Sequence, residues 1–346
     1  MTASDFLSRL RGRHNEGIVA LTIVLLALIV GALNPGFLGL ATVFNVLRNS
    51  YEPLLFALGV MLVLLMGGID VSFDAVGIFA GYGTSVLAAH GLLGGHLWLM
   101  FLVSTLIGAG LGAINALIVS LGRLSILIVT LGTRGIFVGV MLTFVGSSFI
   151  SDLPMSLQTF NIDYLYQTHT ATGQLAGLQI LVVPIAITCL LIDLGLRFTV
   201  IGRGIYAVGG SEEAARRAGF PVGMIKTIVF CCAGALAGAA GMVHVSLIGY
   251  ANPQDIVGNE LIVIAAVVLG GASIFGGRGS VLGTVLGVLL LELIQYCLII
   301  LGVQSSWDNV AIGVMIFVGI ALQVKRAPGG RARVFAGGAK PSESPS

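Results

Sequence analysis

The sequence predicts an all-α, polytopic membrane protein of about ten transmembrane helices. Hydrophobic residues make up 57% of its 346 residues, whereas charged residues make up only 9%. Apolar runs near the roughly 20 residues that cross a bilayer recur along the whole chain. The alternating ten-residue segments of a membrane β-barrel do not occur. A soluble protein with buried helices is disfavoured because it would not need so many runs of spanning length.

The expected spans begin at 17–34, which follows a short basic arm at 1–16 and is long for the core of a cleaved signal peptide. Residues 36–51, which include Arg48, are too polar to cross easily and predict an amphipathic helix on the outer face. The tail at 325–346 is rich in Pro, Gly and Ser and predicts disorder. The other nine spans are expected at 53–68, 72–90, 97–120, 124–147, 177–196, 225–248, 260–275, 280–302 and 307–324.

The distribution of basic residues predicts the orientation. If the chain starts inside, both termini and the loop 197–224 are cytoplasmic, and the acidic loop 148–176 is external. Only Arg48 then lies outside, and Arg134 falls within the fifth span, which agrees with the positive-inside rule. Two five-helix halves would have opposite orientations, as inverted repeats do, although no sequence repeat is visible. The residues assigned to the cytoplasmic side are Arg9, Arg11, Arg13, Arg123, Arg197, Arg203, Arg216, Arg217, Lys226, Arg278, Lys325, Arg326, Arg331, Arg333 and Lys340.

Within the loop 197–224 the sequence predicts a short polar helix at 211–218. Ser211 can cap its first free amides, and its acidic residues precede its basic residues, as the helix dipole favours. Gly219 can adopt the left-handed conformation that ends a helix, and Pro221 prevents continuation. A helix this short is not stable alone in water. It is therefore expected to dock against a soluble partner.

A second polar segment, Gly67 to Gly77, interrupts two apolar spans and contains Asp70, Ser72 and Asp74. An Asp at the membrane centre costs about 2.5–3.5 kcal/mol on insertion scales, and the paired glycines permit a break in the helix. One interpretation is a discontinuous helix that lines a polar pathway or gate. The other is a cytoplasmic turn in which Asp70 is a solvated helix cap.

Other polar residues inside the spans are open to two interpretations as well. Asn115, in the fourth span, either hydrogen-bonds to a neighbouring helix or lines the pathway. His244, Glu292 and Gln295 could each pair inside the bundle, and Glu260 could be a first-turn carboxylate. Small-residue pairs predict close helix packing, at Gly77/Gly81, Gly108/Gly112, Gly234/Gly238 and Gly283/Gly287.

The sequence predicts no catalytic residue, no bound metal and no cofactor in this chain. Its four cysteines fall in apolar segments without metal or redox spacing. The Gly-rich run at 270–279 lacks the Gly-Lys-Ser/Thr ending of a phosphate-binding loop, so the chain does not hydrolyse ATP by that route. An intramembrane aspartyl protease is disfavoured because Asp70 and Asp74 lie on one short segment.

Three stretches resemble the permease subunits of bacterial ABC importers for monosaccharides, of the ribose, galactose and autoinducer-2 type. They are Gly67-Gly-Ile-Asp-Val-Ser72, the region from Asn115 through Val129-Thr-Leu-Gly-Thr133, and the set at 209–219, 264–273 and 276–279. The resemblance covers nearly all of 17–324. It is less exact at Asp74, where relatives commonly have a small residue, near Ser125, where many have Pro, and at Ile262-Val263, where many have Asp-Ala.

The resemblance implies a permease that forms the path for a sugar or related polyol across the bacterial inner membrane. It implies three partners besides the lipid bilayer: a separate ABC ATPase, a periplasmic sugar-binding protein, and a second permease, either identical or homologous. No nucleic-acid partner is expected. Asp70, Ser72, Asp74 and Asn115 would belong to the pathway or gate. The coupling residues that would dock into the ATPase are Gly210, Ser211, Glu212, Glu213, Ala214, Ala215, Arg216 and Gly219.

The competing hypothesis is a secondary transporter or channel that carries a small polar solute without ATP. Broken helices and buried carboxylates would suit that class equally well. The capped helix at 211–218 argues against it, because an ion-coupled carrier needs no such docking element.

Overall fold

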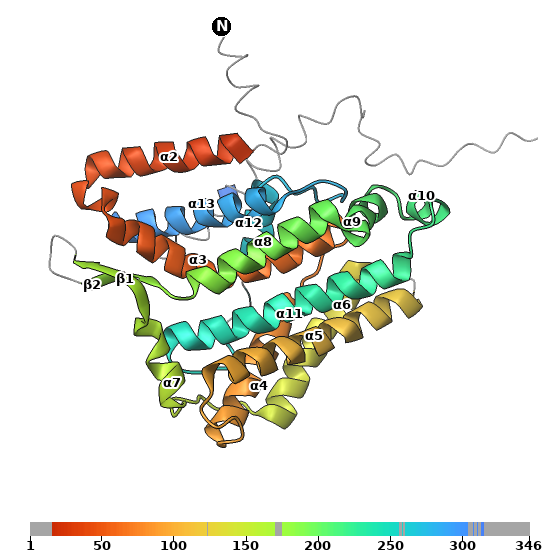
Figure 1. Ribbon diagram of the computed structural model, residues 1–346, viewed down its shortest axis with the longest axis horizontal. Coiled ribbons are helices and arrows are strands. Elements are labelled where there is room, and N and C mark those ends of the chain that lie inside the picture. Colours follow the sequence, from red (N-terminus) through yellow and green to blue (C-terminus); the bar gives the residue numbers. More distant parts are fainter. Residues whose placement is uncertain are drawn as a thin grey trace, which may run out of the picture.

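The computed structural model describes residues 16–122, 124–169, 175–255, 258, 260–303, 307, 310, 313 and 314. Its long helices run roughly along one common direction (Figure 1). The elements are α2 (Glu16–Leu33), η1 (Pro35–Leu38), α3 (Leu40–Leu65), α4 (Phe73–Ala89), α5 (Leu97–Gly122), α6 (Ile126–Val140), η2 (Met141–Val145), α7 (Met155–Gln158), η3 (Phe160–Ile162), β1 (Tyr164–His169), β2 (Leu175–Gln179), α8 (Val182–Phe198), α9 (Val200–Gly210), α10 (Glu212–Arg217), α11 (Val222–Ile248), α12 (Glu260–Leu269) and α13 (Val281–Ile300).

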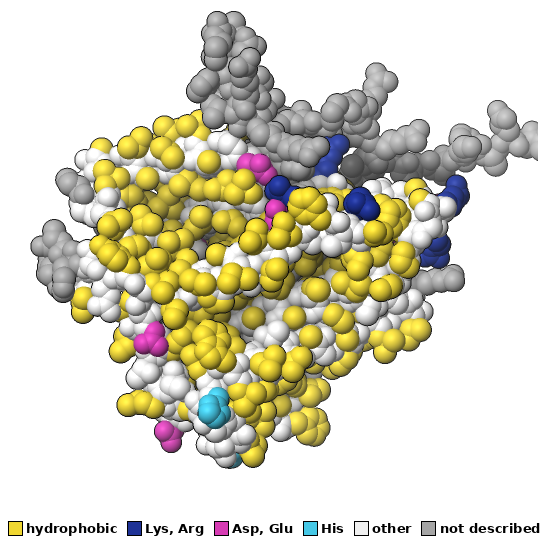
Figure 2. All heavy atoms as spheres, in the orientation of Figure 1, with side chains coloured by type: hydrophobic (Ala, Val, Ile, Leu, Met, Phe, Trp, Pro, Cys, Tyr) yellow, Lys and Arg dark blue, Asp and Glu magenta, His cyan; other side chains and the backbone are white. Residues whose placement is uncertain are grey.

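The two ends of the bundle differ in character. The hairpin β1–β2 lies at one end and α10 at the other (Figure 1); we call these the hairpin end and the α10 end. In Figure 2 the face in view is largely hydrophobic, and its Lys and Arg side chains gather toward the α10 end. An apolar belt with a basic end is the surface expected of a membrane protein.

The core of the bundle forms around α11, which packs against α3, α4 and α5. Small residues allow these helices to approach closely, as predicted. A Cβ added at Gly108 of α5 would lie 2.2 Å from the carbonyl oxygen of Gly234 in α11. The two backbones therefore touch, and larger residues at these positions would force the helices apart.

Among the described residues, six helices are long and apolar enough to cross a membrane, or seven if α8 and α9, bent by 74° at their junction, count as one span. α4 and α12 are shorter, with 17 and 10 residues. The expected tenth span, 307–324, lies almost wholly outside the described residues, as do most of the arm 1–16 and the tail 325–346. The polytopic all-α class is confirmed, whereas the number of ten spans stays a prediction.

The prediction of a separate amphipathic helix at 36–51 is wrong. Residues 36–38 belong to η1, and from Leu40 onward a single helix, α3, continues without a break to Leu65 and includes Pro53. Its polar side chains have partners inside the protein: Ser50 donates to the carbonyl of Val46 (2.6 Å) and Arg48 to that of Leu247 (3.3 Å). These contacts allow polar residues to lie in a helix that is continuous with an apolar span.

The expected external loop 148–176 contains regular secondary structure. It contains α7, η3 and the strand β1, which pairs antiparallel with β2. The strands displace the start of the next helix, which begins at Val182 and not at 177. The chain therefore carries a small two-stranded sheet in addition to its helices.

Candidate functional site

The helix α10 has the two ends that the sequence predicts. Ser211 has extended backbone angles, and its side chain accepts the N–H of Ala214 (3.3 Å). Gly219 adopts a φ of 87°. The N–H of Phe220 then reaches back to the carbonyl of Ala215 (3.1 Å), as in a Schellman motif. Both ends of this one-and-a-half-turn helix are thus satisfied by local contacts.

Ion pairs cover the exposed side of α10. Glu212 accepts from Arg216 (3.1 Å) and from Lys226 of α11 (2.9 Å), and Glu213 pairs with Arg217. The hydrogen bond from Lys226 is the main reason that the pKa of Glu212 lies below its usual value; the pairing with Arg216 acts in the same direction. The side chains of Glu213 and Arg217 are 76% and 78% exposed. They offer a partner two opposite charges side by side.

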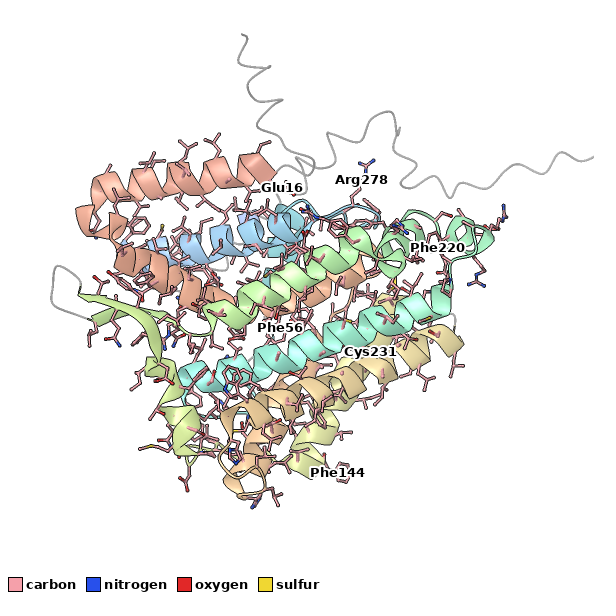
Figure 3. The ribbon with its side chains drawn as sticks, in the orientation of Figure 1. Glu16, Phe56, Phe144, Phe220, Cys231 and Arg278 are labelled. Carbon is pink, nitrogen blue, oxygen red and sulfur yellow. The ribbon has the colours of Figure 1, made fainter. Side chains whose placement is uncertain are left out.

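The opposite side of α10 is anchored to the bundle. Ala215 is buried, and Phe220, labelled in Figure 3, packs against the hydrophobic core. The preceding helix, α9, meets α3 at backbone contact, because a Cβ on Gly209 would lie 1.8 Å from the carbonyl oxygen of Leu65. The same carbonyl accepts the N–H of Gly277 (2.9 Å). A displacement of α10 and α9 would therefore push directly on the end of α3.

The chain between α3 and α4, residues 66–72, is the predicted break. Asp70 is buried and accepts from both the backbone N–H and the hydroxyl of Ser72 (2.7 Å each). Asn115 of α5 donates to the same hydroxyl (2.8 Å). Thr130 of α6 donates to the carbonyl of Ile69 (3.3 Å). Because Asp70 is only 4% exposed, the interpretation of a solvated cap is wrong, and the break is held by a buried polar network.

Asp74 belongs to a different cluster. It lies in the first turn of α4, is fully buried, and pairs with Arg134 of α6 (3.3 Å). Arg134 also pairs with Glu260 at the start of α12. The N–H of Gly258 donates to Asp74 as well (3.4 Å). This Asp74–Arg134–Glu260 cluster joins three helices around one cation and two carboxylates.

A third polar cluster lies between α3, α11 and the chain before α12. Nδ1 of His244 lies 2.7 Å from a carboxylate oxygen of Glu52, and Nε2 lies 3.8 Å from Asp255. The prediction that His244 pairs inside the bundle is thus confirmed. Among the described residues, no group of three or more His, Cys, Asp or Glu side chains is arranged to hold a metal ion.

The structure divides the predicted pathway residues between two clusters. Asp70, Ser72 and Asn115 lie together, as a shared role requires, whereas Asp74 lies with Arg134 and Glu260. Sequence reasoning noticed Arg134 and Glu260 but gave neither a pathway role. The signal that could have indicated this cluster was a lone arginine inside an apolar span, because a charge within the membrane needs a partner of opposite sign.

Comparison with known proteins identifies the class of the chain. Residues 42–319 match the family described as the permease component of the branched-chain amino acid transport system. The chain belongs to this permease family. No solved structure matches the chain.

Three curated relatives are import permeases. An autoinducer 2 import system permease of Yersinia enterocolitica is 32% identical over 313 residues, which cover 88% of this chain and 83% of the relative. A ribose import permease of Haemophilus influenzae is 31% identical over 87% of this chain and 90% of the relative. A ribose import permease of Bacillus subtilis is 33% identical over 91% and 96%. Each of these similarities covers most of this chain and most of the relative.

Proposed function

We propose that the chain is the transmembrane permease subunit of an ATP-binding-cassette importer in the bacterial inner membrane. It would form the path for a monosaccharide or related polyol, and both of its termini would lie in the cytoplasm. Membership of a permease family supports the transport role. The relatives named for ribose support a monosaccharide as the class of solute. ATP hydrolysis would reside in a partner subunit, since this chain has no phosphate-binding loop.

The observation that carries the proposal is the construction of α10. A helix of six residues with two satisfied ends, one buried side and one charged exposed side needs a function for its exposed side. Its ion pairs are worth little to stability at such exposure. Docking into an ABC ATPase subunit supplies that function. The other proposed partners are a periplasmic sugar-binding protein at the hairpin end and a second permease copy or homologue.

The contacts of α10 support a route for the coupling. ATP binding in the partner would move α10, and the backbone contact between Gly209 and Leu65 would carry the motion to the break at 66–72. There the network of Asp70, Ser72 and Asn115 would act as the gate. The exchange of inward and outward access would follow as rigid-body movement of the halves. Inverted repeat halves and ten spans belong to this proposal.

Charge reversal on α10 tests the proposal. We expect Glu213→Arg to insert normally but to abolish both sugar-stimulated ATP hydrolysis and ATP-driven sugar uptake, when the chain is reconstituted with its ATPase and binding protein. Glu213→Gln removes only the negative charge of this pair and leaves Arg217, so it should reduce coupling less than Glu213→Arg does. The swap Glu213→Arg with Arg217→Glu serves as the matched control, because it keeps an ion pair on the helix but reverses the charges offered to the partner.

The outcomes separate the two hypotheses. If the swapped pair restores coupling, α10 needs only an intact ion pair and the docking role is contradicted. If the isolated chain takes up solute in vesicles under a proton or sodium gradient without ATP, the alternative of a secondary transporter is correct. Absence of uptake under either gradient, together with ATP-driven uptake in the assembled complex, supports the importer.

A further inference from the structure

The chain that follows α11 is attached to the rest of the protein at two points. α11 ends at the hairpin end of the bundle (Figure 1), and residues 249–255, which we call the strap, continue from it. The backbone of Ala251 exchanges two hydrogen bonds with Ile150 (2.9 Å each), which follows α6 and η2 in the chain. At its other end the strap returns to α11, where Asp255 faces His244.

The attachment at His244 needs a proton that the neutral side chain does not supply. Nδ1 of His244 lies 2.7 Å from Glu52. Because an ionised carboxylate only accepts, Nδ1 carries the hydrogen, and Nε2 of the neutral ring is then a bare acceptor. Nε2 lies 3.8 Å from Oδ2 of Asp255, and neither of these buried atoms has a hydrogen-bond partner among the described residues. Two acceptors that face each other repel, so a proton is required between them.

The charged groups around this site do not replace that proton. Arg48 of α3 donates to a backbone carbonyl of α11 (3.3 Å) and forms no ion pair within the described part of the chain. Glu292 of α13 adds a third carboxyl within electrostatic range of Glu52. The side chains of His244, Glu52 and Asp255 are 16%, 22% and 21% exposed. Protons can therefore reach the site, although it lies largely inside the protein.

The other elements that pack against α11 leave this site undisturbed. α5 and η3 contain no titratable residue. In α4, Asp74 pairs with Arg134, and Tyr82 donates to the carbonyl of Ser148 (2.9 Å). α9 and α10 meet α11 near its start, at the α10 end of the bundle (Figure 1). The protonation of this site is thus decided by the groups of α3, α11, α13 and the strap.

We propose that Glu52, His244 and Asp255 form a proton-binding site that fastens the strap to α11. With the proton bound, the imidazolium donates to both carboxylates, and such charge-assisted hydrogen bonds are stronger than neutral ones. When the proton leaves to solution, Nε2 becomes an acceptor that faces a carboxylate, and the strap is held mainly by its bonds to Ile150. An imidazole changes charge within the ordinary range of solution pH. The strap therefore loosens as the pH rises.

A spin label on the strap tests the proposal. Gln254 is exposed, so a nitroxide on Gln254→Cys, with the four native cysteines replaced, reports the mobility of the strap in lipid nanodiscs. We expect the mobile fraction of its EPR spectrum to rise about threefold from pH 5 to pH 9, as the imidazole loses its charge. A label on Asp163→Cys, an exposed position outside the strap, should show no change.

Two substitutions separate a proton-dependent role from a structural one. Asp255→Asn gives Nε2 a partner that can donate as well as accept, so the label should stay immobile at every pH. His244→Gln removes the titrating ring, so the mobile fraction should not vary with pH. The matched control is His90→Gln, which removes an exposed histidine at the end of α4 and should keep the full pH response.

Three results would overturn the proposal. One is equal mobility of the label at pH 5 and pH 9. Another is a pH response that survives in Asp255→Asn or in His244→Gln, since the proton would then bind elsewhere. The third is loss of the response in His90→Gln, which would assign it to the other histidine.

The proton site is separable from the proposed function, because the spin label reports on the chain without its ATPase. ATP-driven uptake by a chain whose strap shows no pH response would overturn this inference and leave the importer standing. A pH response of the strap, together with no ATP-driven uptake in the assembled complex, would support the proton site and contradict the importer.

Discussion

α10 and the Asp74–Arg134–Glu260 cluster both contain ion pairs, but these pairs differ in their burial and in the elements that they join. The two pairs within α10, Glu212–Arg216 and Glu213–Arg217, are exposed and join residues four positions apart, so each contributes a few tenths of a kcal/mol. The cluster joins three separate helices around a fully buried carboxylate. If one side chain of this cluster is removed, a buried charge is left without a partner of opposite sign. The comparison suggests that the exposed charges serve recognition and the buried charges hold the bundle together.

The largest expected effect breaks the buried cluster. Arg134→Leu leaves Asp74 and Glu260 without their cation and should destabilise the protein by about 3–5 kcal/mol. Thermal unfolding in detergent measures the loss. The control is Arg197→Leu, which removes an ion pair with Asp193 from a side chain that is 62% exposed, and should change stability by about 0–1 kcal/mol. Equal losses in the two variants would contradict the distinction between buried and exposed pairs.

An intermediate effect is expected at the contact that connects the two regions. Gly209→Ala places a Cβ against the carbonyl of Leu65, and such overpacking costs about 1–3 kcal/mol. The neighbouring variant Gly210→Ala should cost nothing, because a Cβ there meets no atom within 4 Å. Unfolding of the two variants under the same conditions provides the measurement. A loss in Gly210→Ala equal to that in Gly209→Ala would show that the contact with α3 is not what matters.

The smallest expected effect is the pH dependence of α10. The pKa of Glu212 is lowered, chiefly by the hydrogen bond from Lys226. A carboxyl of this kind stabilises the fold above its unfolded pKa, near 4.3, and the contribution disappears as the pH falls through the lowered value. Exchange protection of the α10 amides should therefore be the same at pH 7 and pH 5.5 and decline below about pH 4. In Glu212→Gln this decline should vanish; its persistence would assign it to another group.

Local signals allowed much of α10 to be predicted from the sequence. Ser211, Gly219 and the order of acidic and basic residues each act within a few positions, so the caps and the ion pairs within α10 follow from spacing alone. The link from Glu212 to Lys226 spans fourteen residues and depends on where α11 begins. Rules of helical spacing relate residues three or four positions apart, so they do not predict this contact.

The buried clusters could be predicted only in part, because their partners are distant in sequence. Asp70 and Ser72 are neighbours, and their contact was within reach, but Asn115 joins them from 43 residues away. Asp74 and Glu260 meet at Arg134 only because α4, α6 and α12 pack around one point. Hydropathy placed most of the spans, yet it separated residues 40–51 from the rest of α3. The reason is that hydropathy carries no information on the internal partners of Arg48 and Glu52.

The most direct test of the central claim, that α10 is the contact through which an ATPase acts, is to label and cross-link position 213. In Glu213→Cys, with the native cysteines replaced, a membrane-impermeant maleimide should react only when the cytoplasmic face is open, and a short bifunctional reagent should join this residue to the ATPase subunit. Asp163→Cys, at the hairpin end, should react from the outside of intact cells. Labelling of position 213 from outside, or no ATPase joined to it in the assembled complex, would contradict the claim.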